Sequence, residues 1–530
     1  MDPVVVVGSG ASGAHFALMA LEKGRRVVML DVGHAGGSHV NPADTFAGLK
    51  RNLQDPAEYF LGKQYESLVM PGHHGEYYAF PPGKAHVFRN REESGYQADG
   101  FSPLQSFATG GLAEAWTGGC YPFNQTDLAS FPFPYGDLAP YYARIARRIG
   151  VTGVTDDLSQ VFPVHEGLSE PLELDDHAAT LLQTYSRRRS KFNGALLGHA
   201  RVAVLSRDAG DRKACRYCGR CLWGCPTRAF YTPSITIDEC RKYPGFEYVQ
   251  GIYVDHFKAD SGGRVRSVVG HGASGATHEF PADSLVLAAG TLGSSRIFLE
   301  SIYRDTGKAP ELRGLMDNRQ VLMPFVNLRM LGRRWNPDTY QYHQLALAVK
   351  SGAGGQYLHG LITTLKTALT HPLIQTLPFD LASSAAVFRN VHAALGMVNI
   401  NFPDYRRDDN VVALDTASTP HKVVIHYHPE PGESAMLREN ISRFRGILRK
   451  LGCFAPGSTI HVRPKGASVH YSGTVPMSSE PAPLTCSSQG RSHDFQNLYF
   501  VDGTSFPYLP AKNLTFTLMA NAARIADLAF

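Results

Sequence analysis

The chain has 530 residues, more than one ordinary hydrophobic core accommodates, so two or more domains are expected. Its hydrophobic content of 43% and charged content of 19% are those of a soluble globular protein, and a net charge of +5 is too mild at this length to indicate nucleic-acid binding. No uninterrupted apolar stretch is long enough to span a bilayer.

The first predicted elements form a strand–helix–strand unit around a glycine-rich turn. Val4–Val7 is an apolar, β-branched run, a helix is predicted at about residues 14–23, and a second strand ends at Asp31. The turn carries Gly8, Gly10 and Gly13. Such glycines let a pyrophosphate approach the backbone, and the carboxylate after the second strand can bind ribose hydroxyls. The unit predicts a dinucleotide site, with three chance glycines in an ordinary turn as the alternative.

The strand starts almost at the initiator Met, which leaves no room for a signal peptide. A cytoplasmic location is therefore expected, and export in the folded state with a signal-bearing partner is the alternative.

Residues 34–105 are rich in Gly, Pro, His and Tyr and show little periodicity, which is typical of a long loop that covers a cofactor. The pair His73-His74 has no partner at metal-ligand spacing, so we interpret it as loop. Strands are predicted at residues 248–257 and 284–287. The apolar, partly helical segment 351–396 is predicted to be core rather than a membrane or partner surface.

Four of the eight cysteines form a C-x2-C-x2-C-x3-C run of Cys215, Cys218, Cys221 and Cys225, directly before Pro226. This spacing is typical of iron–sulfur proteins, because thiolates bind iron well. The spacing leaves the ligand set open between four cysteines on a [4Fe–4S] cluster and three on a [3Fe–4S] cluster. A structural zinc site and free thiols are the alternatives.

The chain resembles the glucose–methanol–choline (GMC) family of FAD oxidoreductases over essentially its whole length. The first matching stretch is the glycine turn with Asp31, although Glu is commoner at that position in the family. The others, in the family's order, are residues 109–119, 131–142, 287–290 with Ser294-Ser295, and 501–504 with Pro507 and residues 513–515.

The resemblance implies an α/β protein, α+β overall, with a Rossmann-like FAD-binding domain and a discontinuous substrate-binding domain built from an antiparallel sheet and helices. The expected FAD-binding domain comprises residues 1–133, 198–312 and 466–530, with a cysteine-rich insert at 213–228. The expected substrate-binding domain comprises residues 134–197 and 313–465.

Within the family, residues 469–474 are similar to the catalytic-histidine segment of pyranose oxidase and of sugar or polyol dehydrogenases. Pyranose oxidases attach flavin covalently at a Thr-His pair where this chain has Glu114 and Ala115, so non-covalent FAD is implied. The dehydrogenase branch keeps a cysteine-rich insert with an iron–sulfur cluster near the flavin, although its cysteine spacing differs from the run at 215–225.

By this resemblance His470 is the base that takes the hydroxyl proton, a role that suits imidazole because its pKa lies near neutrality. Asn513 would hydrogen-bond the substrate oxygen. The implied FAD contacts are Gly8, Gly10 and Gly13 at the pyrophosphate, Asp31 at the ribose, Val254 at the adenine, Gly110 and Gly111 near the flavin, and Asp502 and Gly503 in the C-terminal loop.

The expected function is an FAD-dependent dehydrogenase of a sugar, polyol or glycoside hydroxyl whose electrons leave through the cluster to an external acceptor. That acceptor would be a carrier protein or a small partner subunit. An oxidase of the same fold, with structural cysteines or zinc, is the alternative, and a catalytically idle flavoprotein is a third. No motif in residues 313–465 names the substrate.

Overall fold

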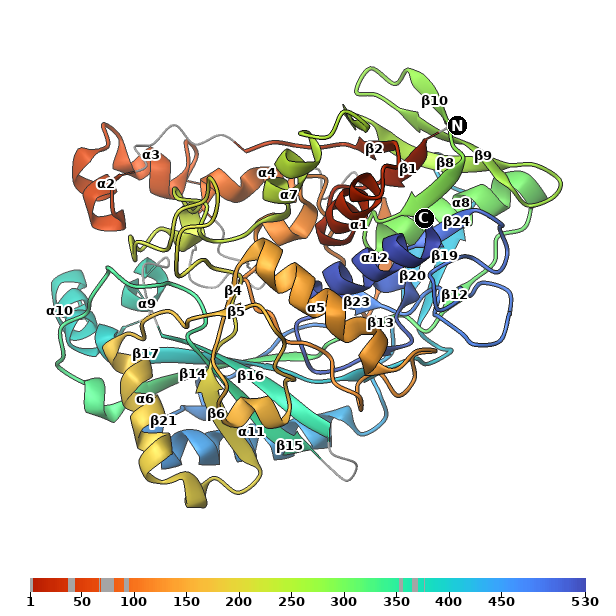
Figure 1. Cartoon of the computed structure of the whole chain (residues 1–530). Coiled ribbons are helices and arrows are strands. Elements are labelled where there is room, and N and C mark those ends of the chain that lie inside the picture. Colours follow the sequence, from red (N-terminus) through yellow and green to blue (C-terminus); the bar gives the residue numbers. More distant parts are fainter. Residues whose placement is uncertain are drawn as a thin grey trace.

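The computed structural model describes residues 3–36, 43–65, 67, 81–89, 95–351, 356–364, 370–375 and 377–530. His73 and His74, interpreted as loop from the sequence, lie outside the described residues. Two sheets dominate the chain: the parallel one lies at the upper right of Figure 1, near both marked termini, and the antiparallel one lies below it.

The parallel sheet has five strands in the order β24-β11-β1-β2-β7. Its central strand β1 (Val4–Val7) is entirely buried and pairs with β2 (Val27–Asp31) and β11 (Ser284–Leu287). The edge strands are β24 (Leu498–Phe500) and β7 (Phe246–Gln250). Helices α1 (Ala11–Glu22) and α12 (Thr515–Ala529) pack together beside this sheet, as Figure 1 shows. The predicted strand–helix–strand unit is therefore confirmed, although the helix starts three residues earlier than predicted, so that Gly10 is its N-cap and Gly13 lies within it.

The single strand predicted at residues 248–257 is wrong, because two strands occupy this region. After β7 the chain turns at Gly251, whose φ is 86°, and then forms β8 (Tyr253–Ala259). Strand β8 leaves the parallel sheet and joins β9 (Val265–His271) and β10 (Thr277–Pro281) in an antiparallel sheet. A left-handed glycine between two β-rich stretches breaks the strand without interrupting their apolar pattern.

The second large sheet has seven antiparallel strands, six of them in the order β21-β14-β17-β16-β15-β6 with β22 also paired to β14. One face packs on α6 (Asp176–Arg187) and α11 (Glu433–Lys450) in an apolar cluster that includes Leu181, Phe325 and Phe444. The strands are β6 (Ala195–His199), β14 (Gln320–Asn327), β15 (Leu345–Ser351), β16 (Gln356–Thr364), β17 (Leu395–Asn401), β21 (Cys453–Phe454) and β22 (His461–Val462). The predicted fold class, a parallel nucleotide-binding sheet beside an antiparallel sheet with helices, is confirmed.

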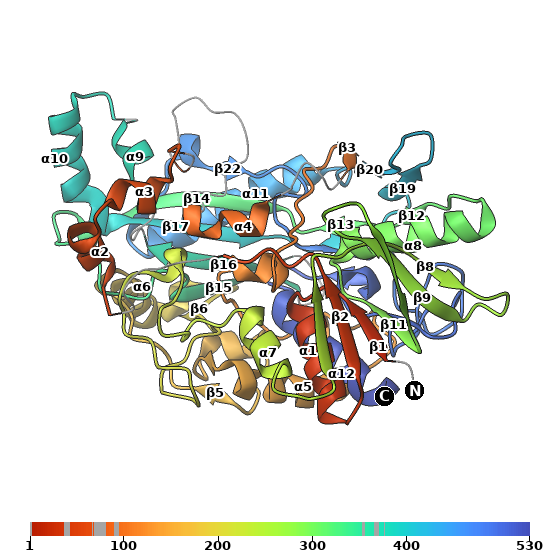
Figure 2. The same ribbon diagram turned by 90° about the horizontal axis from the view of Figure 1, so that it is seen from above.

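The prediction that segment 351–396 forms core holds for β16 and is wrong for the helices after it. Helix α10 (Leu381–Val391) follows α9 (His371–Gln375) at the periphery, far from the parallel sheet in Figure 2. Leu381 is 75% exposed and Phe379 57% exposed. Apolar content alone does not specify which helices pack against a sheet.

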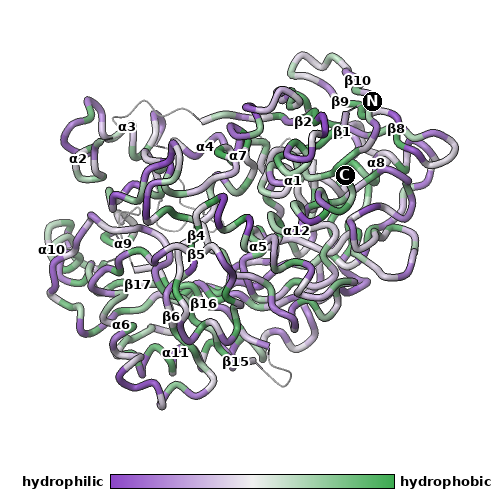
Figure 3. The backbone as a smooth tube through the Cα atoms, in the orientation of Figure 1, coloured by the Kyte–Doolittle hydropathy of each residue, from purple (hydrophilic) through white to green (hydrophobic). Residues whose placement is uncertain are grey.

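Other helices connect these layers: α2 (Phe46–Asn52), α3 (Pro56–Leu61), α4 (Ala85–Phe88), α5 (Tyr135–Ile149), α7 (Pro233–Cys240) and α8 (Thr291–Thr306). In Figure 3 the outer loops are largely purple, whereas strands inside the molecule are mainly green. None of the helices in the described part of the chain is long and apolar enough to cross a membrane.

Candidate active site

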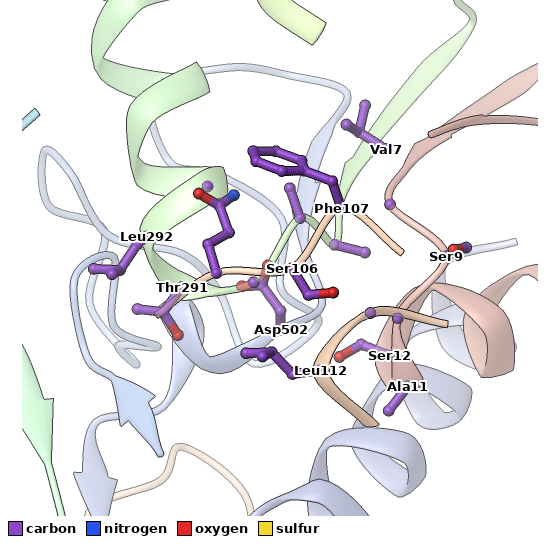
Figure 4. A pocket seen from close by; sticks show the side chains of 18 of the residues that line it. Val7, Ser9, Ala11, Ser12, Ser106, Phe107, Leu112, Thr291, Leu292 and Asp502 are labelled. Carbon is purple, nitrogen blue, oxygen red and sulfur yellow. The ribbon is translucent and has the colours of Figure 1, made fainter. Parts of the chain in front are cut away.

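An open cavity lies at the carboxyl ends of β1, β2 and β11, where parallel α/β sheets bind ligands, and its empty space of about 1240 Å³ includes solvent at its mouth. Figure 4 shows its walls, with Ser9, Phe107 and Asp502 contributed by segments far apart in the sequence. The predicted residues that line it are Gly8, Gly10, Asp31, Gly111, Val254, His470, Asp502 and Gly503. Gly13, Gly110 and Asn513, also predicted, stand outside this lining.

The glycine turn between β1 and α1 forms one wall, and its glycines serve different purposes. Gly8 has a φ of 98°, and a Cβ added there would lie 2.6 Å from the carbonyl oxygen of Ala288, so this position needs glycine for the fold. A Cβ added at Gly10 would meet no atom within 4 Å, because Gly10 borders the cavity. The open space above Gly10, at the start of α1, fits a pyrophosphate.

Asp31 ends β2 and is held in place by two hydroxyl groups that the sequence reasoning missed. Ser9 donates to its carboxylate, and Tyr248 of β7 donates over 2.9 Å. Burial raises the pKa of Asp31 to about 6, while these hydrogen bonds oppose the shift. The Ser9 hydroxyl also accepts from the Gly110 backbone N–H at 2.9 Å, so it joins the two glycine motifs. Asp31 is thus positioned to accept hydrogen bonds from a ribose.

Asp502 anchors the C-terminal wall of the cavity. Its carboxylate accepts from the hydroxyls of Ser294 and Thr504, each at 2.6 Å. On the opposite side, the carbonyl oxygen of Val254 accepts from Arg296, whose guanidinium lies 4.6 Å from the centre of the Tyr253 ring. Val254 therefore lies at the cavity, as the adenine prediction requires, although its carbonyl is occupied by Arg296.

His470 lines the cavity and lies in a strained segment. Val469 before it has a φ of 62°, an unusual conformation for a β-branched residue that is typical of functional sites. The Nδ1 atom of His470 is 3.0 Å from Oδ1 of the fully buried Asn318. The Asn318 amide nitrogen donates to the carbonyl oxygens of Phe402, at 2.8 Å, and Pro510, at 3.1 Å.

The Asn318 contacts fix the protonation of His470. Since both amide donors of Asn318 are used, its Oδ1 faces the imidazole as an acceptor, and Nδ1 carries the proton. The Nε2 lone pair is then free. Burial, together with the Arg463 cation, lowers the pKa of His470 to about 4, so the ring is neutral at pH 7. A neutral histidine with a free Nε2 can act as a base. The sequence around Asn318 contains no motif that predicts its role in fixing the protonation of His470.

Asn513 lies against the second glycine motif rather than in the cavity wall. Its Oδ1 is buried without a hydrogen-bond partner, and a Cβ added at Gly119 would be 3.0 Å from this atom. The catalytic role expected for Asn513 stays a prediction.

The four cysteines of the run lie in one loop. Left-handed backbone at Tyr217, Gly219 and Gly224 curls this loop. Burial and the neighbouring thiols raise the pKa of Cys215 to about 12. Over the described residues, which include the whole run, no group of three or more His, Cys, Asp or Glu side chains is placed to hold a metal ion. The geometry therefore does not support the expected ligand set of Cys215, Cys218, Cys221 and Cys225 for an iron–sulfur cluster.

Comparisons with known proteins agree with this fold. Residues 407–522 match the family described as GMC oxidoreductase. The chain is 25% identical to 6'''-hydroxyparomomycin C oxidase of Streptomyces lividus, over 98% of this chain and 90% of that protein. It is 22% identical to 2-methyl-1,2-propanediol dehydrogenase of Mycolicibacterium austroafricanum, over 99% and 94%. The structure of pyridoxine 4-oxidase from Mesorbium loti is similar with a TM-score of 0.63 at 14% identity, covering 100% of this chain and 99% of that one.

The parallel sheet and the full-length structural match define the class of fold, which is the fold of pyridoxine 4-oxidase. More particularly, residues 407–522 match the C-terminal family model of GMC oxidoreductases, in agreement with the resemblance found in the sequence. The cavity residues fit FAD, since the glycine turn leaves space for its pyrophosphate and a carboxylate stands at the ribose position. The domain boundaries expected from the sequence stay predictions.

Proposed function

We propose that the protein oxidises a hydroxyl group of a sugar, polyol or glycoside with non-covalently bound FAD. The observation that carries this proposal is a neutral His470 with a free Nε2 in the lining of a cavity whose walls suit a dinucleotide. The relatives support it, because one is named 6'''-hydroxyparomomycin C oxidase and another 2-methyl-1,2-propanediol dehydrogenase. Glu114 and Ala115 offer no histidine for covalent attachment at the second glycine motif.

FAD bound in this cavity supplies the acceptor for the hydride that leaves the alcohol carbon. The residues of the chain handle the proton and the geometry. His470 accepts the hydroxyl proton on Nε2, and Asn318 keeps Nδ1 protonated throughout. Asn513 would hydrogen-bond the substrate oxygen through its amide. The alcohol thereby loses one hydride and one proton and becomes a carbonyl.

Replacing His470 with Ala tests the base. The variant should bind FAD normally, whereas the rate of flavin reduction by a reactive alcohol should fall about 10²- to 10⁴-fold, the usual contribution of a general base. Anaerobic stopped-flow bleaching of the flavin measures that rate. Bleaching at the rate of the unmodified protein would favour the idle flavoprotein and overturn the proposal.

The electron acceptor distinguishes the two functional alternatives. A dehydrogenase passes electrons to an external carrier, whereas an oxidase reduces O2, and stoichiometric peroxide without an added acceptor would establish the oxidase. The steps above do not use the expected electron transfer through an iron–sulfur cluster, because the four thiols of the run are not arranged to hold a metal ion. Iron and zinc analysis of anaerobically purified protein tests that hypothesis directly, and about three or four irons per chain would restore it.

A further inference from the structure

A second cavity lies beside the cysteine run, apart from the cavity that suits FAD. Its empty space of about 560 Å³ includes solvent at its mouth, and among the described residues the two cavities share no lining residue. Of the four cysteines of the run, Cys221 and Cys225 line this second cavity, whereas Cys215 and Cys218 do not. The cavity therefore distinguishes two thiols of a motif to which the proposed function gives no role.

A tight turn brings these two cysteines to the same cavity. Cys221 begins a short 3₁₀ turn, η6 (Cys221–Trp223), and its carbonyl oxygen accepts from the Gly224 N–H at 3.4 Å. Gly224 has a φ of 102°, which favours glycine, and Cys225 follows it directly. Both cysteines are partly exposed, and the structure, which describes all eight cysteines of the chain, places none of them in a disulfide. A small molecule in the cavity can therefore reach both sulfurs.

The surroundings of Cys225 favour attack by its sulfur. The Sγ atom accepts from the Phe230 backbone N–H at 3.4 Å, and the Thr227 hydroxyl lies 3.5 Å from it. Lys84 also lines the cavity. Burial lowers the pKa of Lys84 and the charges of Glu114 and Cys225 oppose this shift, so the ammonium group and the sulfur are close enough to interact. Hydrogen-bond donors and a nearby cation stabilise the thiolate, the form that attacks disulfides.

Aromatic rings form the wall beside the two thiols. Trp116, Phe230 and Tyr342 line the cavity, and the centre of the Phe230 ring is 6.4 Å from that of Trp116 and 5.4 Å from that of Tyr342. These packed rings hold the sulfurs in a recess rather than on a protruding surface. A low-molecular-weight disulfide can enter such a recess, whereas a disulfide on a folded protein would have to protrude into it.

We propose that Cys225 and Cys221 form a redox-active dithiol that exchanges with a low-molecular-weight disulfide in this cavity. The Cys225 sulfur attacks one sulfur of the reagent, whose S–S bond breaks, so that one thiolate leaves and a mixed disulfide remains on Cys225. The Cys221 thiol then gives its proton to solvent and attacks the Cys225 sulfur, the second thiol leaves, and an intrachain disulfide forms. The pair thereby loses two electrons, and the reagent is reduced to two thiols.

Glutathione disulfide, added to the FAD-loaded protein as purified anaerobically, tests the exchange. Mass spectrometry of the intact chain and of its peptides, after free thiols are blocked, identifies the product. The unmodified chain should end with a Cys221–Cys225 disulfide, and Cys221→Ser should stop with one glutathione on Cys225. Cys225→Ser should react at least about tenfold more slowly, because it lacks the attacking thiol.

Cys215→Ser and Cys218→Ser are the matched controls, because both residues belong to the same run but do not line the cavity. Both variants should react as the unmodified chain does, with FAD content and thermal midpoint as checks of folding. A first adduct on Cys215 or Cys218, or an intrachain disulfide that joins either of them to Cys225, would overturn the inference. Bound iron that protects all four cysteines from glutathione disulfide would overturn it as well.

Replacing Lys84 with Met tests the cation in the cavity. The exchange should slow about threefold or more, because the thiolate fraction falls by more than the nucleophilicity of the sulfur rises. Lys213→Met is the control, since Lys213 lies in the same loop, pairs with Asp208 at 3.1 Å and does not line the cavity. An unchanged rate in Lys84→Met, or equal slowing in both variants, would contradict the activation of Cys225 by Lys84.

Discussion

At the scale of single residues, three neighbours of His470 determine its chemistry. Val469 holds the backbone in a left-handed conformation, Asn318 fixes the proton on Nδ1, and Arg463 assists burial in keeping the ring neutral. The sequence motif identified His470 itself. It did not identify Asn318, which lies 152 positions away and contacts the imidazole only in the folded chain.

The lowered pKa of His470 predicts the acid side of the pH profile. Neutral imidazole is the active base, so protonation stops the reaction, and the pKa of about 4 means that this happens only in acid. The kcat/KM should stay constant on lowering the pH to about 5 and should fall tenfold per pH unit below about 4. Stopped-flow measurement in overlapping buffers, with FAD content checked at each pH, gives the profile. A midpoint near pH 6.5 would contradict the buried, neutral state.

Replacing Asn318 with Leu should remove the acceptor for Nδ1–H, so that the neutral imidazole can carry its proton on Nε2 instead of Nδ1. The kcat should then fall about tenfold or more, because the reacting nitrogen is no longer basic, while KM changes little. The ¹⁵N-histidine NMR spectrum, assigned by difference from His470→Ala, reports the tautomer directly.

Asn410→Leu is the matched control for Asn318→Leu. Asn410 is equally buried and bonds Leu315 and His428 through its amide, without touching His470. Both variants should lose similar stability, and only Asn318→Leu should change the tautomer. An unchanged tautomer in Asn318→Leu would refute the positioning role.

At the scale of secondary-structure elements, substitutions at two glycines of the β1–α1 turn should distinguish the needs of folding from those of cofactor binding. Gly10→Ala adds a methyl group to open space, so the stability of the apoprotein should stay within about 0.5 kcal/mol. The same methyl group occupies the place of the pyrophosphate, so FAD affinity should fall at least about tenfold.

Gly8→Ala is the contrasting variant. Its methyl group collides with the Ala288 carbonyl from a left-handed backbone, so both stability and FAD affinity should fall. Denaturant unfolding of the apoproteins and fluorescence titration with FAD measure the two effects. If the Gly10→Ala apoprotein were as unstable as the Gly8→Ala apoprotein, the assignment of Gly8 to folding and of Gly10 to FAD binding would be contradicted.

Two sequence patterns, the apolar segment 351–396 and the cysteine spacing, led to predictions that the structure does not support. The apolar character of segment 351–396 correctly placed β16 inside the sheet but could not distinguish it from the exposed helix α10. The cysteine spacing predicted a cluster because it matches ferredoxins. Spacing records only the order of thiols along the chain, and their positions in space depend on how the loop packs.

At the scale of the whole molecule, the FAD cavity is assembled from segments between Val7 and Leu518. Because no single segment forms it, FAD should bind the folded protein and not the unfolded chain. Free FAD at a thousandfold excess over its Kd should therefore add about 4 kcal/mol to the free energy of unfolding. Thermal unfolding at increasing FAD concentration measures this, with Gly10→Ala as a variant that needs more FAD for the same shift. A midpoint independent of FAD would contradict the assignment of the cavity.

The sequence by itself predicted the parallel strand–helix–strand unit, the family resemblance and three residues that line the cavity, Asp31, His470 and Asp502, because these depend on short motifs whose spacing is local. Only the tertiary structure decided the partners of those residues: Tyr248 on Asp31, Ser294 on Asp502 and Asn318 on His470. It also decided which two thiols of the cysteine run share a cavity, since the walls of that cavity come from residues distant in the chain.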